Sequence, residues 1–457
     1  MTDLIAPLDT TFHRQMSRVQ VAPFRFNHRL AFYMAIVLLC GFLGPSEASI
    51  KAGLNLTTLR IAILIAMVPV LLEFCRKIVR GGYVPVVSDF AVFMLAAWMI
   101  FGLYVIHGPK GAASASALAG VEFLVAYLVG RCFCGTYAGA EQFVSILAGF
   151  AIVLLLIGFV DVAAHDNILA RVASKIFGTI RSLKIGNVTV EYRVQFRFGL
   201  VRVRGPFEQS IHFGTFFAML VPLFWYVLRA KWHRIVMVAV AIVGTLLSIS
   251  SAAVISCLLV LAFIGYDLGL NRSRWRWALL VAAAAYCAAL FGLLVDDPLA
   301  WLISGLTFNP QTGFYRLQQW YWVGYNLEAS PFFGIGDKDW IRPLSIVNSL
   351  DSLWLVFATR HGYVGVALLA LVVLGSRFVW TPRPIPVYPH PRAHEIGKAI
   401  ALALIGAIFV SFTVHLWAKI WIFLGLIVGI RAGLSEARYL HPSVRGDAAE
   451  AAVPPAA

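Results

Sequence analysis

A succession of long apolar runs dominates the sequence and limits the folds that the chain can adopt. Each run has about 17 to 25 residues, the length at which a helix crosses the hydrocarbon core of a bilayer. Ser248, Ser250 and Ser251 mark a polar turn that divides the stretch 233–268 into two runs. The sequence therefore predicts an all-α polytopic membrane protein of about twelve transmembrane helices. We place the helices near 30–46, 57–74, 86–107, 112–130, 140–162, 210–228, 233–249, 251–268, 277–295, 352–375, 398–416 and 418–434.

The composition is that of a chain whose solvent is lipid. Hydrophobic residues make up 60% of the 457 positions and charged residues 13%, whereas a soluble domain is about half apolar and about a quarter charged. The net charge of +15 does not indicate a nucleic-acid partner, because the basic residues are scattered over short segments between the apolar runs. That distribution is typical of the orientation signal of a membrane protein.

We expect no metal and no cofactor. Cys132-x-Cys134 has no second cysteine pair to complete a metal site, and all six cysteines are interpreted as small apolar residues or cytoplasmic thiols. Asp337-Lys-Asp339 imitates the D-x-D metal motif of some glycosyltransferases, but two acids in a loop are usually just solvated. The polar, basic stretch before the first apolar run is too long for the n-region of a cleavable signal peptide.

The basic residues also predict the orientation of the helices. They gather in alternate segments between the apolar runs, and segments of this kind stay in the cytoplasm. We therefore expect both termini in the cytoplasm of a bacterium, with the helices in its inner membrane. The predicted parts are a cytoplasmic N-terminal segment, 1–29; transmembrane helices 1–5, 30–162; a first large periplasmic loop, 163–209; helices 6–9, 210–295; a second large periplasmic loop, 296–351; helices 10–12, 352–434; and a cytoplasmic tail, 435–457.

The first large loop, 163–209, is rich in basic residues although the positive-inside rule disfavours them on that side. Residues 169–183 have the pattern of a basic amphipathic helix at the membrane surface. The second half alternates as a strand does, and the alternation reverses at Gly199, which predicts a bulge or turn. Arg202 and Arg204 then share a face. The loop presents either a solvated basic face or a guanidinium cluster for pyrophosphate, which arginine binds bidentately.

The second large loop, 296–351, has many aromatic residues around Arg316. Trp320 and Tyr321 belong either to an interfacial aromatic belt or to stacking platforms for a sugar. Arg316, Gln319 and Trp320 would share one face of a helix, because residues three and four positions apart are neighbours there. That arrangement would place a charge, an amide and a flat ring together.

Ionisable residues at the end of this loop and inside the apolar runs are further candidates. Asp351 precedes the tenth run, which carries Arg360 and His361, and charges at such depth normally face a polar interior. Asp351 is either a helix cap or a general base at the mouth of a cavity, held by Arg360. His361 can equally be a satisfied interior histidine. Glu122, in the fourth run, is expected to form a structural pair.

Several short motifs follow one another in a fixed order between about residues 200 and 374. They are Arg202-Val-Arg204-Gly205-Pro-Phe207, Leu247-Ser248 with Ser250-Ser251-Ala, Arg316-x-x-x-Trp320, Pro331-Phe-Phe-Gly334-Ile-Gly336, Asp351-Ser352-x-Trp354-Leu355 and Gly362-x-x-Gly365. Their order and spacing resemble the O-antigen ligase/polymerase superfamily, whose members join lipid-linked saccharides on the periplasmic face. Two departures are Asp351, where the ligases typically show a histidine-centred motif, and Ser352 in place of the usual Asn.

The resemblance implies a GT-C-like membrane glycosyltransferase with an inverting, metal-independent mechanism and a polyprenyl-pyrophosphate-linked oligosaccharide as its substrate. It places pyrophosphate binding on loop arginines, which here are Arg202, Arg204 and Arg316, with Arg360 beside them. The candidates for the base that takes the acceptor proton are Asp351 first, then Glu208, His212 and His361. Trp320 and Tyr321 are the candidate sugar-binding residues.

The leading hypothesis is a polymerase that extends exopolysaccharide or O-antigen, with a chain-length regulator as a candidate partner and the lipid bilayer as its medium. The alternative within the class is a ligase that transfers finished glycan to lipid A core or protein. From another class comes a flippase for lipid-linked oligosaccharide, which should show repeats and charges along a midplane path. A structural scaffold has no need of arginine-rich outer loops.

Overall fold

The structure, a computed structural model, describes residues 28–438 apart from short stretches within that range. The stretches left out are 53, 80–82, 178–181, 186–187, 192–193, 271–272, 274, 296–309, 345, 347 and 381–390. Almost all of the predicted N-terminal segment, 1–29, and most of the predicted tail, 435–457, lie outside the described residues. The first part of the second large loop, 296–309, also lies outside them.

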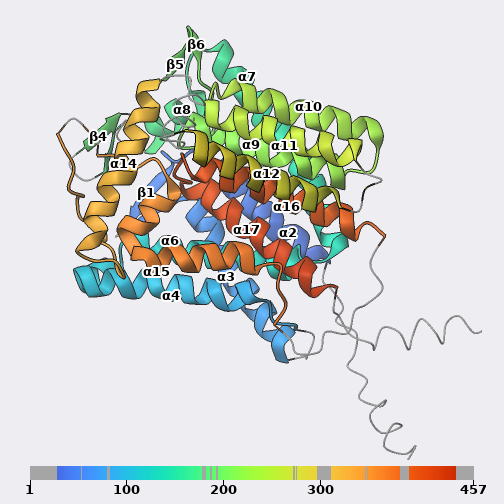
Figure 1. Ribbon diagram of the computed structural model, residues 1–457, viewed down its shortest axis with the longest axis horizontal. Helices are drawn as coiled ribbons and strands as arrows, with labels where there is room; N and C mark the ends of the chain where they lie inside the picture. Colours follow the sequence, from blue (N-terminus) through green and yellow to red (C-terminus); the bar gives the residue numbers. More distant parts are fainter. Residues whose placement is uncertain are drawn as a thin grey trace, which may run out of the picture.

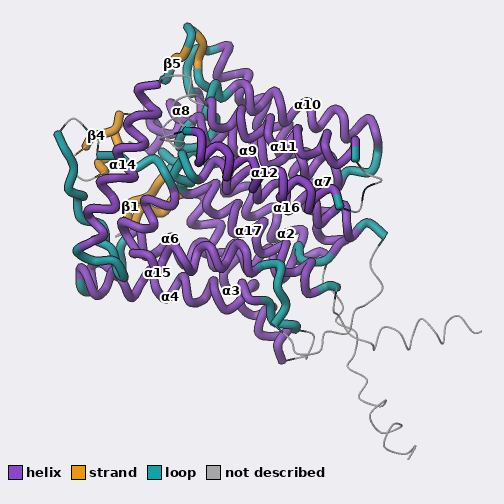
Figure 2. The backbone as a smooth tube through the Cα atoms, viewed as in Figure 1, coloured by secondary structure: helices purple, strands orange, loops and turns teal. Residues whose placement is uncertain are grey.

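Each of the twelve predicted runs coincides with a helix (Figures 1 and 2). Within the described part of the chain, ten helices are long and apolar enough to cross a membrane, with Pro109–Phe133 counted as one. The other two, α2 and α10, have 16 and 17 residues. The architecture is that of an all-α, multi-pass membrane protein. The helices are α2 (His28–Leu43), α3 (Thr58–Val79), α4 (Val87–His107), α6 (Ala115–Phe133), α7 (Tyr137–Ala163), α9 (Ser210–Val227), α10 (Lys231–Leu247), α11 (Ser251–Gly269), α12 (Arg276–Leu294), α15 (Leu353–Gly375), α16 (Ala393–Ser411) and α17 (Ala418–Glu436).

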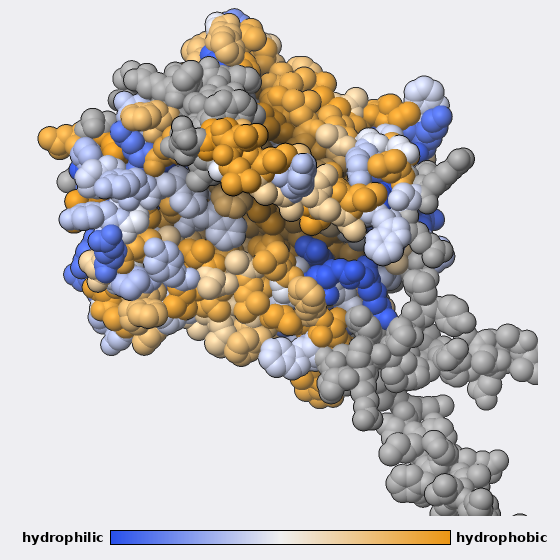
Figure 3. All heavy atoms as spheres, in the orientation of Figure 1, coloured by the Kyte–Doolittle hydropathy of each residue, from blue (hydrophilic) through white to orange (hydrophobic). Residues whose placement is uncertain are grey.

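Helices α9 and α17 form the centre of the bundle, and 89% of the apolar window of each is buried. Helix α17 packs along α6, where small residues allow the two backbones to approach closely. A Cβ atom at Gly130 would lie 2.2 Å from the carbonyl oxygen of Leu426, and one at Gly429 would lie 2.0 Å from that of Tyr127. The outer helices present apolar side chains to their surroundings, as the predominantly hydrophobic surface in Figure 3 shows.

Hydrogen bonds between helix ends show which ends lie together. At one end Ser435 Oγ donates to the carbonyl of Ser376, over 2.9 Å. At the other end Ser352 Oγ donates to the carbonyl of Ser411, over 3.2 Å. Successive spanning helices run antiparallel, so α2 begins and α17 ends at the first of these ends. We call it the terminal end, and we call the opposite end, where the described residues of 44–57, 164–209 and 329–352 lie, the loop end.

The first large loop forms helix α8 (Ile168–Phe177) followed by short antiparallel hairpins (Figure 1). The predicted helix over 169–183 is too long, because Ser182–Ile185 is strand β3, paired with β4 (Val188–Glu191). The predicted turn at Gly199 is confirmed: Phe198 and Gly199 have φ of 54° and 75° and join β5 (Phe196–Arg197) to β6 (Leu200–Val201). Glycine suits a turn of this left-handed type. A further hairpin, β1 (Ser49–Ala52) with β2 (Leu54–Thr57), joins α2 to α3.

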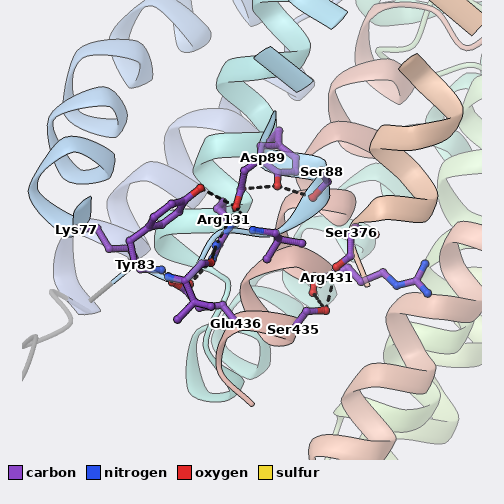
Figure 4. Close-up of polar contacts among 12 residues, drawn as sticks. Lys77, Tyr83, Ser88, Asp89, Arg131, Ser376, Arg431, Ser435 and Glu436 are labelled. Atoms are coloured by element: carbon purple, nitrogen blue, oxygen red, sulfur yellow. Dashed lines mark hydrogen bonds and ion pairs between the residues drawn. The ribbon is translucent and has the colours of Figure 1, made fainter. Parts of the chain in front are cut away.

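A buried charge network ties four helices together at the terminal end (Figure 4). Arg131 of α6 has a fully buried side chain and donates to Asp89 of α4 over 3.0 Å and to Glu436 of α17. Lys77 of α3 also pairs with Glu436. Tyr83 Oη donates to Asp89 Oδ2 over 2.8 Å. The buried Arg131 and the partly buried Lys77 therefore face two buried carboxylates, and such pairing is the condition under which burial of charge is tolerated.

Glu122, the intramembrane acid of the fourth run, is paired, as predicted. Glu122 accepts a hydrogen bond from Arg60 Nε over 2.7 Å, and Arg60 Nη1 donates to the carbonyl of Asn55 over 2.8 Å. Cys132 and Cys134 are buried and not disulfide-bonded, in keeping with their interpretation as small apolar residues.

Candidate functional site

The arginine-rich hairpin of the first loop rests on the serine turn between α10 and α11. Arg202 Nε lies 3.4 Å from the carbonyl oxygen of Ser248, and Arg202 Nη1 donates to Gln195 Oε1 over 2.9 Å. Arg197 Nη1 donates to the carbonyl of Ile249 over 3.2 Å. The first two sequence motifs, 202–207 and 247–252, thus meet at the loop end.

Arg197 lies within electrostatic range of both Arg202 and Arg316. Burial and the nearby Arg197 lower the pKa of Arg202 to about 10. Burial also lowers the pKa of Arg316, with a further contribution from Arg197. Arg316 comes from α14 (Pro310–Glu328) in the second large loop. The two large loops therefore bring their cations to a common place, which is favourable for an anion.

Asp351 faces this cluster. Its Oδ2 lies 4.0 Å from Arg316 Nε, and its side chain remains 43% exposed. Partial burial raises the pKa of the Asp351 carboxyl, and the Arg316 guanidinium opposes the shift. Gln319 positions the segment: it donates to the carbonyl of Ser349 over 2.9 Å and accepts from the Asp351 N–H over 3.3 Å. The prediction that Arg360 holds Asp351 is wrong, because Arg360 Nε lies 3.5 Å from Asp337 Oδ1 instead.

Helix α15 is interrupted beside this site. Gly362 has a φ of 67°, outside the helical region. The motif from Pro331 to Gly336 packs into the interruption: the Tyr363 N–H donates to the carbonyl of Pro331 over 2.8 Å, and the Ile335 N–H donates to that of Thr359 over 2.7 Å. Broken helices at membrane depth are tolerated where other groups take up the freed backbone polar atoms. The interruption explains why both glycine-containing motifs occur in the sequence.

The interruption also orients the two ionisable residues that precede it. Arg360 points to Asp337, which accepts a further hydrogen bond of 2.6 Å from Ser116 Oγ. His361 is 2% exposed, and its ring lies 5.2 Å from that of Phe357. Its Nδ1 atom has no hydrogen-bond partner among the described residues. His361 is therefore buried in the bundle, and Arg360 pairs with Asp337 and not with Asp351.

Glu208 and His212 lie in a second buried cluster with a lysine that the motifs did not indicate. His212 Nδ1 is 3.7 Å from Glu208 Oε2, and Lys419 Nζ is 3.9 Å from Glu208 Oε1. His212 Nε2 donates to the carbonyl of His415 over 2.9 Å. The neutral tautomer fixed by that bond leaves Nδ1 as an acceptor, and its distance from Glu208 Oε2 is too long for a hydrogen bond.

Arg204 reaches this second cluster and not the first. Its Nη2 donates to Glu47 Oε1 over 2.7 Å, and both side chains are more than nine-tenths buried. The predicted common face of Arg202 and Arg204 is therefore wrong, because their guanidinium groups have different neighbours. Glu47 follows the first apolar run and carries no motif, which is why sequence reasoning missed it.

Sequence reasoning also missed His415, which occupies the short turn between the last two spans. Burial lowers the pKa of His415 far below its ordinary value, and the charge of Arg360 contributes to the shift. His415 belongs to the second cluster, since its carbonyl accepts the hydrogen bond from His212. In the sequence His415 stands four residues before Lys419, and both are single ionisable residues next to apolar runs. That pattern could have indicated them.

The candidate sugar-binding aromatics lie on the open side of α14. Trp320 is 41% exposed and Tyr321 73% exposed, and the rings of Tyr321 and Trp322 meet edge to face at 5.6 Å. Arg316 and Gln319 instead face the protein, with Trp320 at the boundary between them and solvent. The surface position of Trp320 and Tyr321 suits a bulky ligand that approaches along α14.

The D-x-D segment does not have the geometry of a metal site. Asp337 contacts Arg360 and Ser116, and Asp339 pairs with Arg342 over 2.7 Å. Among the described residues, no group of three or more His, Cys, Asp or Glu side chains is placed to hold a metal ion.

Several buried polar atoms at the loop end have no hydrogen-bond partner among the described residues. Such atoms cost free energy unless a polar partner satisfies them. They include Arg316 Nε, Glu208 Oε2, Ser210 Oγ, His212 Nδ1, His361 Nδ1 and His415 Nδ1.

Comparison of the sequence with family models gave no match, and comparison with curated proteins gave none either.

Proposed function

We propose that the protein is a membrane glycosyltransferase that polymerises polyprenyl-pyrophosphate-linked oligosaccharide repeat units into exopolysaccharide or O-antigen. The observation that carries this proposal is the meeting of Arg197, Arg202 and Arg316 beside Asp351, at the interrupted helix α15. A cluster of guanidinium groups suits pyrophosphate, and a carboxylate next to it suits a general base.

In the proposed reaction the growing chain on its lipid pyrophosphate is the donor and a single lipid-linked repeat unit is the acceptor. An acceptor hydroxyl forms a bond to the anomeric carbon, the bond from that carbon to the pyrophosphate oxygen breaks, and the acceptor proton moves to Asp351. The polyprenyl pyrophosphate leaves with the bonding electron pair. Arginines that face the leaving group stabilise the negative charge that develops on it.

The solvent exposure of the candidate bases ranks them. Asp351 is 43% exposed at the side chain, whereas Glu208, His212 and His361 are buried. Asp351 is therefore the proposed base, and the three buried residues are proposed to position the elements around it. Arg202 and Arg316 are the leading candidates to bind the pyrophosphate. Arg204 and Arg360 instead face the carboxylates of Glu47 and Asp337, which a phosphate would have to displace.

The positive-inside rule assigns the loop end to the periplasm of a bacterial inner membrane. Lipid-linked repeat units would then reach the site from the outer leaflet. A chain-length regulator remains a proposed partner, and no nucleic acid takes part.

The experiment is complementation of a strain that lacks the gene, followed by electrophoresis of its polysaccharide. Arg202→Ala, Arg204→Ala and Arg316→Ala are each compared with Arg171→Ala, which removes an arginine of the same loop that pairs with Asp166 and is 41% exposed at the side chain. We expect Arg202→Ala and Arg316→Ala to shorten or abolish the ladder, since loss of one such donor costs about 10²-fold or more in rate. Unchanged chain lengths at normal expression in all three would exclude the site.

The deletion strain itself separates the polymerase from its alternatives. Accumulation of short lipid-linked units favours the polymerase, and accumulation of long unattached chains favours a ligase. Trapping of the substrate on the cytoplasmic face would indicate a flippase. The charges gathered at the loop end are unlike the midplane path expected of a transporter.

A further inference from the structure

Lys419 is a buried cation in the first turn of helix α17. It is the second residue of that helix and is 2% exposed. Burial disfavours an ammonium group, and the positive end of the helix dipole disfavours a cation at this position as well. A charge kept in a membrane helix against both effects is expected to serve a purpose that its neighbours disclose.

Three consecutive residues of the first large loop surround the Lys419 ammonium group. Lys419 Nζ donates a hydrogen bond to the carbonyl of Pro206. It lies 3.9 Å from Glu208 Oε1 and 5.8 Å from the centre of the Phe207 ring. A carbonyl oxygen, a carboxylate and a ring are all suitable neighbours for a cation out of water. The last spanning helix is therefore tied to the stretch of loop that follows Arg202.

That stretch, the segment 203–208, is buried throughout and belongs to no helix or strand. A buried segment without regular structure needs partners elsewhere for its polar groups. The Val203 N–H donates to the carbonyl of Leu247 over 3.1 Å, and Arg204 donates to Glu47 over 2.7 Å. The path of the segment is therefore set by contacts to several other parts of the chain.

The direction of the Arg202 side chain depends on how both flanks of its backbone are held. On the hairpin side, the Arg202 N–H donates to the carbonyl of Gln195 over 2.8 Å. On the other side lies the segment 203–208. Loss of the Lys419 contact would leave the Pro206 carbonyl without this donor and Glu208 without its lysine. The segment could then shift and carry Arg202 with it.

We propose that Lys419 is a positioning residue for the pyrophosphate site. It holds the segment 203–208 in the conformation that presents Arg202 to the leaving pyrophosphate. Because Lys419 is buried, it acts through Arg202 and not on the substrate itself. This inference rests on the proposed polymerase activity and adds to it a residue from the opposite end of the chain.

The test is a double-mutant cycle on the rate of polymer synthesis by the purified full-length protein, supplied with lipid-linked units from a strain that lacks the gene. Lys419→Met should lower kcat by up to about 10²-fold, because a small misplacement of a binding group has effects of that size. Lys419→Arg retains a cationic donor and should keep more of the rate. In the Arg202→Ala background, Lys419→Met should change the rate by less than about twofold, since its effect passes through Arg202. Equal losses in both backgrounds would overturn the proposal.

The matched control is Lys398→Met. Lys398 is also a largely buried lysine of a spanning helix, 16% exposed at its side chain, and it pairs with Asp267 over 2.5 Å, but at the terminal end. Its loss should lower the thermal stability and leave kcat unchanged. An equal loss of kcat in Lys398→Met and Lys419→Met would show a general effect of a missing buried cation and would overturn the positioning role.

Hydrogen–deuterium exchange tests the same contact without the enzymatic activity. Lys419→Met should speed the exchange of amides in the segment 203–208, while amides at the terminal end keep the rates of the wild-type protein. Lys419→Met with Glu208→Gln leaves no unpaired carboxylate at this contact, which protects the fold, and should show the same local increase. Unchanged exchange of the segment in both variants would overturn the proposal.

The two proposals fail in different ways. A wild-type protein that makes no polymer would overturn the proposed function. An active wild-type protein with an equally active Lys419→Met variant would overturn the role of Lys419 alone.

Discussion

Asp351 and Arg316 face each other at the entrance to α15, and 4.0 Å separates the carboxylate oxygen from the guanidinium nitrogen. This distance is too long for a hydrogen bond, so the carboxylate keeps its lone pairs available to an acceptor hydroxyl. Partial burial raises the pKa of Asp351, and the Arg316 charge counteracts that rise. The two effects together set the strength of the proposed base.

We predict that Arg316→Gln moves the acid limb of the activity profile to higher pH. Removal of the positive charge leaves the burial effect unopposed, so the pKa of Asp351 rises further and the carboxylate is protonated at a higher pH. The measurement is residual polymer synthesis as a function of pH. The control is Arg342→Gln, since Arg342 pairs with the exposed Asp339. An acid limb that stays in place or moves to lower pH would contradict the role of this pair.

Several residues of the site could be predicted from the sequence, and others could not. Asp351 and Arg316 stand out as charges at the edge of aromatic or apolar stretches. The partner of Arg360 could not be deduced, since Asp337 comes from a segment whose path depends on the interruption of α15. Lys419, His415 and Glu47 were missed because each is a single charge or ring without a motif, and their contacts join distant parts of the chain.

At the scale of elements, the interruption of α15 determines the shape of the loop end. Gly334 and Gly362 both have positive φ, of 73° and 67°, and their backbones approach each other closely. A Cβ atom at Gly362 would lie 2.0 Å from the carbonyl oxygen of Phe332, and one at Gly334 would lie 2.4 Å from that of Thr359. Trp98 completes the packing by donating from Nε1 to the carbonyl of His361 over 2.9 Å and by stacking on Phe333.

We predict that Gly362→Ala lowers the thermal stability of the detergent-solubilised protein. The strained φ alone costs about 1–3 kcal/mol, and the clash with Phe332 adds to it. Gly265→Ala is the control, because a Cβ atom there meets nothing within 4 Å and Gly265 lies inside α11. Gly265→Ala should leave the stability of the protein unchanged or raise it by about 0.5–1 kcal/mol. Equal unfolding temperatures for the two variants would show that the interruption is not required.

An element could be predicted from the sequence where the features that specify it are local. The apolar runs predicted every spanning helix within a few residues, because the length of a run and the polar turns around it are local features. The end of α8 at Phe177 was not predicted, because Leu183 continues the amphipathic pattern while its backbone pairs with β4. Pairing across a hairpin depends on residues outside the repeating pattern, and there it prevailed over the helical pattern.

At the scale of the whole molecule, the terminal end is joined by the Arg131 network across α3, α4, α6 and α17 (Figure 4). We predict that Arg131→Gln destabilises the protein by about 3–5 kcal/mol, because it leaves Asp89 and Glu436 buried without their main cation. Thermal unfolding in detergent measures the effect.

The control for this prediction is Arg229→Gln. Arg229 pairs with Glu141 at the same end, but its side chain is 73% exposed, and such surface pairs contribute about 0–1 kcal/mol. A loss of stability no larger for Arg131→Gln than for Arg229→Gln would contradict the structural role of the network.

The orientation of the whole molecule has its own prediction. In a variant without the native cysteines, Phe198→Cys should react with a membrane-impermeant maleimide added to spheroplasts, and Trp232→Cys should react only after the membrane is disrupted. Both side chains are exposed, at 78% and 77%, so accessibility depends on the side of the membrane alone. Labelling of Trp232→Cys in intact spheroplasts would reverse the assignment of the loop end to the periplasm.

The proposed reaction is tested most directly by the purified protein and its substrate. The lipid fraction of a strain that lacks the gene supplies the lipid-linked units, and gel electrophoresis measures the length of the products. We predict that the wild-type protein extends the units into a ladder with release of polyprenyl pyrophosphate, and that Arg316→Ala does so about 10²-fold more slowly. Products of unchanged length with the wild-type protein, or an equal ladder with Arg316→Ala, would contradict the proposal.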